Sequence, residues 1–339
     1  MQFQIIISRD LMETAFVTGA NGLVGSNLCH KLSELGYTVV AMVRGNSDIV
    51  GLNGFRGKKV RGDIMDSDSL VKLIEGSDYV FHTAGLVSFD NRRRKELLRI
   101  NVEGTRNVMQ AARKANVKKV VHTSSVAAIG IPRSGVEMAD ESTEYNKFRY
   151  RIAYADSRHL GEMEVRKAVD SGLDAVIINP ASIVGPRDVY SHFGVLLKLF
   201  KDKKIVPYVP GGMCVVDVDD VVSGEISALK SGRSGERYII GGENLSFKEL
   251  FAKIAGIVNA SPPNLRIPIW AARCAASIFE ILSAITGKPP VLTKAHVASA
   301  TLPHYYSFAK AKRELGIEPH PIDRAIQKAY EWYEDNGLM

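Results

Sequence analysis

Three glycines in the run TGANGLVG have the spacing of a phosphate-binding turn. Gly19, Gly22 and Gly25 directly follow the β-rich run 14–18 and open a helical pattern. The first glycine permits a tight turn, the second lets backbone approach a pyrophosphate, and the third allows close helix packing. Free N–H groups and a positive dipole at the helix N-terminus favour the same ligand. The run therefore predicts a dinucleotide-binding turn.

The residue at the end of the next predicted strand selects between dinucleotides. An acidic residue there would accept from a ribose 2′-hydroxyl, whereas Arg44, 19 residues after Gly25, offers a guanidinium fork for a 2′-phosphate. We therefore expect NADP(H) as the preferred cofactor, with NAD(H) as the alternative. Asp63, in RGDIMD, has the chemistry to accept from the adenine amino group; its other interpretation is a helix N-cap, which Asp66 or Ser67 fits better.

A tyrosine and an arginine stand one helical turn apart in the run YADSRHLGE. Tyr154 and Arg158 share a helix face, which also carries Ser157, Gly161 and Glu162. Hydride transfer to a carbonyl leaves negative charge on oxygen, which needs a proton donor. An unperturbed phenol has a pKa of ~10. A cation at ~4 Å, with an effective dielectric of ~20, favours the phenolate by roughly 4 kcal/mol. Tyr154 is thereby a candidate general acid/base.

The elements that must position these residues alternate between strands and helices. Apolar runs predict strands at 14–18, 37–43, 58–60, 79–82, 119–123 and 175–178. Helical patterns follow the glycine turn, ending at Gly36, and recur at 67–74, 97–115 and 154–171. Such alternation predicts an α/β fold whose parallel sheet is covered by helices on both faces. Ser125 follows one strand, at the carboxyl edge where such sheets bind ligands.

The regular alternation of predicted strands and helices ends after Pro180. Loops rich in proline and glycine interrupt the alternation, and amphipathic helices follow at 246–258 and 321–335. We expect a dinucleotide-binding domain over residues 12–180 and a smaller substrate-binding lobe over 181–339. Segments 215–229 and 238–240 are expected to return to the main sheet.

Seven runs, in order, resemble the extended short-chain dehydrogenase/reductases. They are TGANGLVG, RGDIMD, FHTAG, NVEGTRNV, HTSSVAAIG, YADSRHLGE and NPASIVGP. The chain is most similar to dihydroflavonol-reductase-like and 3β-hydroxysteroid-dehydrogenase-like members, from Thr14 to about Gly316. The resemblance implies a Rossmann-type doubly wound parallel sheet and an NAD(P)-dependent reductase or dehydrogenase acting on a ketone or secondary alcohol.

The resemblance also places the site. Ser125 matches the catalytic serine, Tyr154 the catalytic tyrosine, and Arg158 stands where the family has lysine; no metal is implied. Together with the glycine turn, it assigns the cofactor to Gly19, Gly22, Leu23, Val24, Gly25, Arg44, Asp63, Ile64, Ala84, Gly85, Asn101, Thr123, Tyr154, Arg158, Pro180 and Ile183.

Arginine at 158 keeps the charge of lysine but not its chemistry. A guanidinium is planar, bulkier and never deprotonated, so it neither relays a proton nor contacts ribose hydroxyls as lysine does. The runner-up tyrosine is Tyr145, with Arg149 at i+4, in a segment expected to be a loop. Two other functions stay open: a nucleotide-sugar epimerase with retained cofactor, and a non-catalytic NADPH-binding regulator. Val126 and Ala127 replace the threonine–acid pair of dehydratases, which disfavours dehydration.

The remaining sequence features are typical of an ordinary globular protein. The net charge of 44 − 37 = +7 lies in short clusters that we interpret as solvated faces, so no nucleic-acid partner is expected. Three distant cysteines, and an N-terminal FQIIIS too short for an export signal, favour the cytoplasm. His82 and His122, on apolar strands, are expected to be buried and satisfied.

The longest apolar stretch, 269–285, contains Arg273 and Glu280 and is expected to be a packed helix, with no membrane contact. Phe89, Tyr190 and Phe193 hint at an apolar small-molecule substrate. The resemblance alone suggests a homodimer through the two long middle helices.

Overall fold

The computed structural model describes residues 12–339 apart from 46, 134, 191–192, 204–206, 288–289, 291 and 303. The N-terminal run FQIIIS lies outside the described residues, and Arg44 and Tyr190 lie within them.

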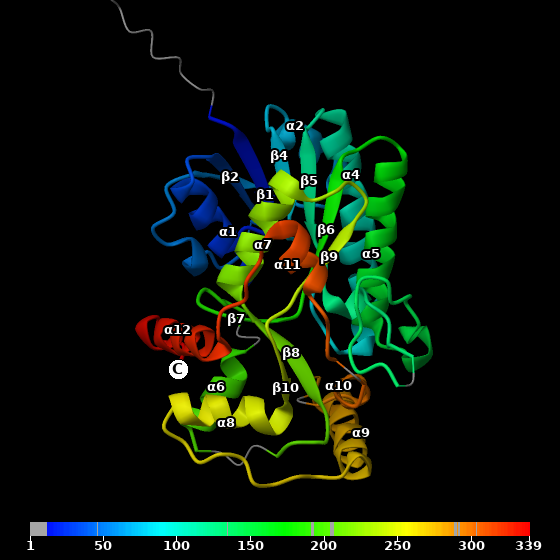
Figure 1. Cartoon of the computed structure of the whole chain (residues 1–339), viewed down its shortest axis with the longest axis vertical. Helices are drawn as coiled ribbons and strands as arrows, with labels where there is room; N and C mark the ends of the chain where they lie inside the picture. The colour runs from blue at the N-terminus through cyan, green and yellow to red at the C-terminus, as the bar shows by residue number, and fades with distance from the viewer. Residues whose placement is uncertain are drawn as a thin grey trace, which may run out of the picture.

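The main sheet has seven parallel strands in the order β3-β2-β1-β4-β5-β6-β9 (Figure 1). Their bounds are β1 Thr14–Thr18, β2 Thr38–Val43, β3 Lys58–Arg61, β4 Tyr79–His82, β5 Lys119–Thr123, β6 Ala175–Pro180 and β9 Arg237–Ile240. The order reverses between β1 and β4, where the carboxyl ends of strands leave room for a ligand. This confirms the predicted doubly wound parallel sheet.

Helices cover both faces of this sheet and enclose two apolar cores. The helices α1 Leu23–Glu34, α7 Val218–Ser231 and α11 Ala309–Leu315 pack on one face, while α2 Ser67–Ile74, α4 Gly104–Lys114 and α5 Ala153–Asp170 pack on the other. The central strands are buried on both sides, as continuous apolar runs require in a parallel sheet. Gly36, with φ +87°, follows α1 in the left-handed conformation expected of a helix-ending glycine.

The predicted helix 97–115 is interrupted by a wider turn. It begins as α3 Arg94–Leu98, passes through a π-helical turn at Arg99–Glu103, and continues as α4. Asn101 lies in that turn and is buried. Such turns are rare and are frequent at functional sites.

A smaller lobe is built on a second sheet of order β10-β8-β7. Its strands are β7 Ser182–Val184, β8 Gly212–Asp217 and β10 Glu243–Ser246, and its helices are α6 Gly194–Lys201, α8 Phe247–Ile257, α9 Ile269–Thr286, α10 Lys294–Ala300 and α12 Ile322–Asp335. A third apolar core joins this sheet to α6, α8 and α12. Although they come after residue 180, β9 is a strand of the main sheet, and α7 and α11 pack against that sheet (Figure 1).

The helix α9 corrects one expectation. Its predicted helical structure is confirmed, but it packs through one narrow face only: Ala272 and Ala276 form a small core with Val297 of α10, Ser283 is also buried, and Ile285 is 76% exposed. Within the described residues, α9 is the one helix long and apolar enough to cross a membrane. The prediction was wrong because the alanines make the contact with the body, while the large apolar side chains face outward.

Candidate active site

The three glycines of the turn differ in what a Cβ atom at each position would contact. Gly19 has φ +66°, and a Cβ there would lie 2.6 Å from the Ala84 backbone; a Cβ at Gly25 would lie 2.3 Å from the Gly19 carbonyl oxygen. These two glycines are required by the protein's own packing. At Gly22 the described chain offers a Cβ only one neighbour, the Gly19 oxygen at 3.3 Å. The space over Gly22 is therefore available to a ligand.

The N-terminus of α1 adds hydrogen-bond donors to this space. Gly22 caps the helix without a side-chain hydrogen bond, so the first-turn N–H groups, beginning at Leu23 and Val24, are left for a ligand. Asn21 fixes the turn from behind, since its Nδ2 donates to the Asp48 carbonyl at 3.2 Å and to the Tyr190 hydroxyl at 2.7 Å. The geometry fits an anionic group such as a pyrophosphate.

Arg44 lies at the same edge of the sheet. It follows β2, whose Met42 carbonyl accepts from the Ala20 N–H of the turn at 3.2 Å. The Arg44 side chain is exposed and makes no ion pair with another described residue. The nearest acid along the chain is Asp48, whose carboxylate accepts from the Val50 N–H.

The other adenosine-side candidates follow β3. The Asp63 carboxylate is exposed and accepts from the Met65 N–H at 2.9 Å, while Asp66 caps α2, as expected. Ile64 is buried, and its carbonyl accepts from Asn107 at 3.0 Å.

Asn101 locks the loop after β4 to the helix α5. Its Oδ1 accepts from the Leu86 N–H at 2.7 Å, and its Nδ2 donates to the Leu86 carbonyl and to the Ser157 hydroxyl, each at 2.9 Å. Ser157 in turn donates to the Tyr154 carbonyl at 2.8 Å. The amide is fully engaged within the protein, so it holds the Ala84–Gly85 loop and α5 in one arrangement.

Tyr154 and Arg158 lie one above the other on α5. Both side chains are 8% exposed, and the guanidinium carbon lies 5.5 Å from the centroid of the phenol ring. Within the described chain, no hydrogen bond engages the phenolic hydroxyl. That hydroxyl is therefore available to a substrate.

Arg158 is a buried cation without an anion. Its Nη1 makes one long hydrogen bond, 3.4 Å to the Thr123 carbonyl, and its buried Nε has no partner among the described residues. No carboxylate of the described chain pairs with it. Gly85 admits the guanidinium, since a Cβ there would lie 2.6 Å from Nη2. A buried, unpaired charge is costly, so the arrangement indicates a group that the chain itself does not supply.

The histidines beside Arg158 are neutral. Burial, with a further contribution from Arg158, lowers the pKa of His82 to about 3, and burial also holds the pKa of His122 well below its ordinary value. His82 is satisfied as expected, by Thr18 at 2.8 Å and Thr105 at 3.1 Å. His122 is buried, but its Nδ1 has no partner in the described chain.

Ser125 stands at the carboxyl end of β5. Its Oγ accepts from the Ala127 N–H at 3.1 Å and caps the short helix Val126–Ala128. Its carbonyl accepts from Asn179 at 2.8 Å. The hydroxyl is half-buried, and its own hydrogen is left to donate toward a substrate oxygen.

Glu162, which the sequence placed on the Tyr154 face of the helix without a role, joins several elements of the main sheet. Its Oε1 accepts from Ser124 at 2.6 Å and from Asn179 at 2.5 Å, and its Oε2 lies 3.4 Å from Arg237. These contacts tie α5 to the carboxyl ends of β5 and β6 and to the first residue of β9. In the sequence, only the spacing of Glu162 at i+8 from Tyr154 pointed to this position, and nothing predicted the contact of Asn179 with Glu162.

Two further predicted site residues, Thr123 and Ile183, lie near the contacts of Glu162. Thr123 donates from its hydroxyl to the buried Glu225 at 2.6 Å, and burial raises the pKa of Glu225 to about 8. Ile183, in β7, is half-buried against the core that α1 shares with α7.

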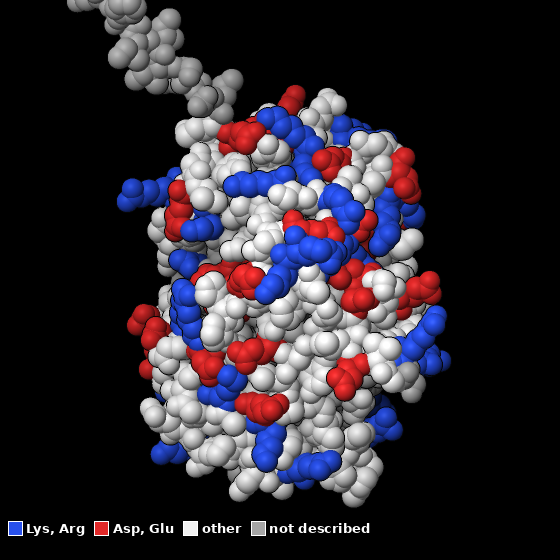
Figure 2. Space-filling model, in the orientation of Figure 1, with Lys and Arg blue, Asp and Glu red and all other residues white. Residues whose placement is uncertain are grey.

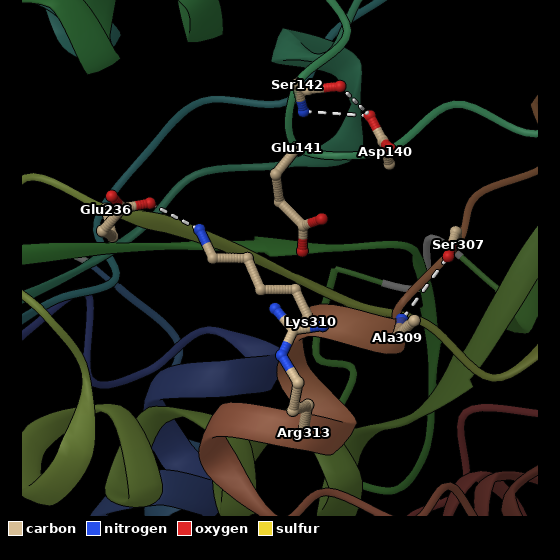
Figure 3. A pocket seen from close by; sticks show the side chains of 8 residues that line it. All are labelled: Asp140, Glu141, Ser142, Glu236, Ser307, Ala309, Lys310 and Arg313. Carbon is tan, nitrogen blue, oxygen red and sulfur yellow. Dashed lines mark hydrogen bonds and ion pairs between the residues drawn. The ribbon is translucent and has the colours of Figure 1, made fainter.

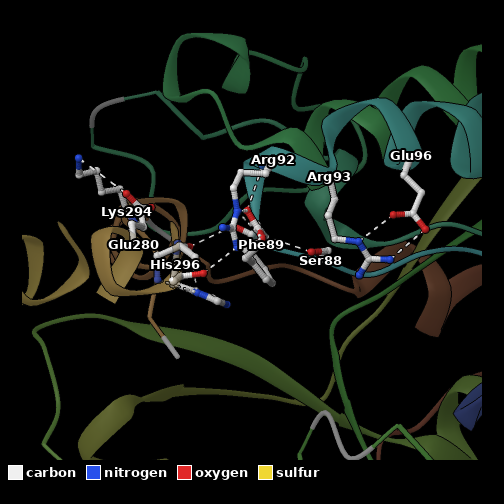
Figure 4. Close-up of polar contacts among 11 residues, drawn as sticks. Ser88, Phe89, Arg92, Arg93, Glu96, Glu280, Lys294 and His296 are labelled. Carbon is white, nitrogen blue, oxygen red and sulfur yellow. Dashed lines mark hydrogen bonds and ion pairs between the residues drawn. The ribbon is translucent and has the colours of Figure 1, made fainter. Parts of the chain in front are cut away.

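Of the three aromatic residues expected near the substrate, Phe89 lies against Tyr154. The centroids of the Phe89 and Tyr154 rings are 5.6 Å apart. Phe89 also contacts His296, and the centroids of these two rings are 4.7 Å apart (Figure 4). Tyr190 is engaged by Asn21, and Phe193 packs in the core of the lobe. Phe89 therefore connects the α9–α10 region to the candidate site.

The runner-up tyrosine is engaged within the protein. Tyr145 donates to Asp156 at 2.7 Å and stacks on His159 with centroids 4.1 Å apart. Burial and the Asp156 hydrogen bond raise the pKa of the Tyr145 phenol. This phenol is a poor acid/base group.

A hollow of about 370 Å³ beside β9 lies apart from these residues (Figure 3). Its charged side chains satisfy one another or the backbone: Lys310 pairs with Glu236 at 2.6 Å, and Glu141 accepts from the Ile239 N–H at 2.8 Å. None of the predicted site residues lines it.

Comparisons with known proteins agree with this fold. The sequence model of the NAD dependent epimerase/dehydratase family matches residues 15–241. A Synechocystis protein provisionally named dihydroflavonol 4-reductase is 35% identical, covering 96% of this chain and 95% of its own. Sterol demethylase protein B of Methylococcus capsulatus is 32% identical, covering 96% and 100%. The crystal structure of gox2253 has a TM-score of 0.83 at 34% identity, covering 96% and 99%.

Proposed function

The chain belongs to the NAD dependent epimerase/dehydratase family and is an oxidoreductase of the extended short-chain type, and from this premise we propose that it is an NADP-dependent reductase. Its reaction would interconvert a ketone and a secondary alcohol, with Tyr154 as general acid/base.

The observation that carries this proposal is the buried, unpaired Arg158 beneath Tyr154. A structural arginine would have a carboxylate partner, because leaving a guanidinium unpaired in the interior is expensive. Next to a phenol with a free hydroxyl, its charge instead stabilises negative charge that develops on the phenolic oxygen during proton transfer.

The remaining residues fit a nicotinamide dinucleotide. The α1 N-terminus and the space over Gly22 would hold the pyrophosphate, the Ala84–Gly85 loop would contact the adenosine side, and Arg44 would pair with a 2′-phosphate. When bound, the coenzyme supplies or accepts the hydride. An acidic residue in place of Arg44 would instead favour NAD(H).

The chain's own residues then handle the oxygen of the substrate. In reduction, Tyr154 Oη donates its proton to the carbonyl oxygen as negative charge develops there, and Ser125 donates a second hydrogen bond. In oxidation, the phenolate accepts the alcohol proton. Arg158 acts through its charge alone, because it does not release a proton. The phenol must therefore exchange its proton with solvent or substrate.

The substrate is a small molecule with an apolar body. Phe89, against Tyr154, supports this, together with the buried Leu97 and the half-buried Leu86 and Ala127 beside it. Apolar walls with one reacting polar group are typical of such sites.

Fluorescence titration with NADPH and NADH, followed by a screen of ketones and nucleotide sugars, tests the proposal. We expect NADPH to bind about ten-fold or more tightly than NADH, and a ketone to oxidise it with equal amounts of alcohol formed. Interconversion of sugars without net loss of NADPH would assign an epimerase. Tight NADPH binding with no turnover would assign a regulator.

A further inference from the structure

The helix α9 turns its large apolar side chains toward solvent and its small side chains toward the protein. Its inward face consists of Ala272, Ala276 and Ser283, with Glu280 at the margin, whereas its outward face carries the large apolar side chains. A surface helix of a globular protein ordinarily shows the opposite arrangement. The described residues therefore leave the large apolar side chains of α9 uncovered.

The outward face carries exposed apolar side chains at both ends of the helix. We define the outer stripe as Trp270, Ile278, Ile281, Leu282 and Ile285, whose exposed fractions are 70%, 58%, 60%, 49% and 76%. The four later residues lie in the second half of α9, and Trp270 lies two turns before them, with the exposed Arg273 and Cys274 in between. Exposed apolar patches of this extent mark interaction surfaces.

The inner face is bonded to the body of the protein. Arg92 donates from Nη2 to the Ser283 hydroxyl at 2.9 Å, and the Lys294 N–H donates to Glu280 at 2.8 Å (Figure 4). These bonds anchor the helix along one side. This arrangement is that of a helix lying on a surface, and not of one that leaves the protein to span a bilayer.

The charge of the described residues around the outer stripe is positive on balance. Among the described residues of 261–302, Arg266, Arg273 and Lys294 are basic and Glu280 is the one acid, which pairs with Lys294 at 3.7 Å. Arg273 is exposed one turn from Trp270, at the border of the stripe. In Figure 2 the surface over α9, at the lower right, is largely uncharged, and both basic and acidic side chains border it. An apolar stripe bordered by cations is complementary to anionic lipid headgroups.

We propose that α9 docks this protein on the surface of an anionic lipid bilayer, with the outer stripe in the boundary between headgroups and acyl chains. Trp270 at the start of the helix has the amphipathic ring that prefers this boundary. A second copy of the chain is the less favourable occupant, because two copies meeting through this face would bring like charges together.

Docking would place the bilayer close to the candidate site. Thr293, just before α10, donates to the Phe89 carbonyl at 3.0 Å, and Phe89 lies against Tyr154. The proposal itself depends only on α9 and stands whether or not the chain is a reductase.

Flotation of the full chain with vesicles tests the proposal. We expect the wild type to float with phosphatidylcholine–phosphatidylglycerol vesicles, more weakly with phosphatidylcholine alone, and less as salt rises. Ile281→Glu and Ile285→Glu should each weaken partitioning by about ten-fold or more. Val195→Glu is the matched control, since Val195 on α6 is likewise 60% exposed and apolar; it should float as the wild type does.

A second measurement does not depend on destabilising substitutions. The chain has two tryptophans, Trp270 and Trp332, so Trp332→Phe leaves Trp270 as the only reporter. Its emission should shift to shorter wavelength when anionic vesicles are added. Absence of both flotation and shift would overturn the proposal. So would a wild-type dimer that Ile285→Glu converts to monomer in light scattering, because a second copy would then cover the stripe.

Discussion

The guanidinium of Arg158 lies directly against the backbone of Gly85, so close that a β-carbon at residue 85 would lie 2.6 Å from Nη2. The loop after β4 and the cation on α5 are thus fitted to each other. Arginine is accommodated here by a glycine that leaves room for its planar group, and the phenol of Tyr154 lies on the same guanidinium.

Replacing Tyr154 by phenylalanine removes the hydroxyl that we propose as proton donor, while keeping the ring that packs on Phe89. We expect kcat to fall by about 100-fold or more, with NADPH affinity unchanged within a factor of about two. Tyr145→Phe is the control, because that hydroxyl is bound to Asp156. Steady-state kinetics with both variants checks this, and equal turnover by Tyr154→Phe and wild type would remove Tyr154 from the site.

Substitutions of Arg158 separate charge from shape. Arg158→Lys keeps the cation and should retain kcat within about ten-fold, whereas Arg158→Met removes it and should lower kcat by about 100-fold or more. Because the wild-type cation is buried and unpaired, Arg158→Met should not lower the thermal midpoint as loss of an ion pair would. Turnover by the methionine variant at the wild-type rate would contradict an electrostatic role.

Arg44→Asp exchanges the guanidinium for a ribose-binding carboxylate. We expect NADPH affinity to fall by about ten-fold or more and NADH affinity to rise, since the acid accepts from a 2′-hydroxyl and repels a 2′-phosphate. Fluorescence titrations give both constants. Arg324→Asp, another exposed arginine, serves as the control on α12; an equal loss in both variants would mean that only net charge matters.

Gly22→Ala places a methyl group where we expect the pyrophosphate. Inside the protein, its Cβ meets only the Gly19 oxygen at 3.3 Å, so the fold should tolerate the change with a small adjustment. Cofactor affinity should fall by about ten-fold or more. Gly256→Ala, where a Cβ has no neighbour within 4 Å, should leave affinity unchanged. Unaltered affinity in Gly22→Ala would place the phosphates elsewhere.

Glu225 should make folding stability depend on pH. Burial raises its pKa from the ordinary value of 4.5 to about 8. Between these values the folded state holds one more proton than the unfolded state, so the free energy of unfolding falls as pH rises through this window. Glu225→Gln does not ionise, and its stability relative to wild type should grow from pH 4.5 to 8, by a few kcal/mol at most, or about 1.4 kcal/mol per pKa unit.

Urea unfolding at several pH values measures this difference. The exposed Glu331→Gln is the matched control and should give a difference that does not change with pH. A flat difference for Glu225→Gln as well would show that the Glu225 carboxyl ionises normally in the folded protein.

The main sheet was predictable because its strands are short apolar runs bounded by turn signals. Lys119–Thr123 and Tyr79–His82 agree with their predicted bounds residue for residue, since a strand buried on both faces requires a continuous apolar run. The second sheet was missed. Val215–Asp217 was expected within a segment returning to the main sheet, but it ends β8 of the lobe, and Asp217 then caps α7.

The site was predictable where spacing along one element decides it, and not where several elements meet. Tyr154 and Arg158 share a helix face by arithmetic alone, and the glycine turn follows from its position after β1. Asn101 makes its side-chain hydrogen bonds within the protein because it lies in a π-helical turn, and the sequence has no pattern that predicts this turn. Likewise, an apolar pattern shows which side chains of α9 share a face, but not whether that face points inward.

The bridge made by Asn101 between Leu86 and Ser157 has a consequence for how this protein can diversify. A single amide joins the loop after β4 to α5, the helix that carries Tyr154, so a shift of either segment must be accommodated by the other. Substitutions at Phe89 or in the lobe lie outside this bridge, so we expect them to leave the loop and α5 in their present arrangement.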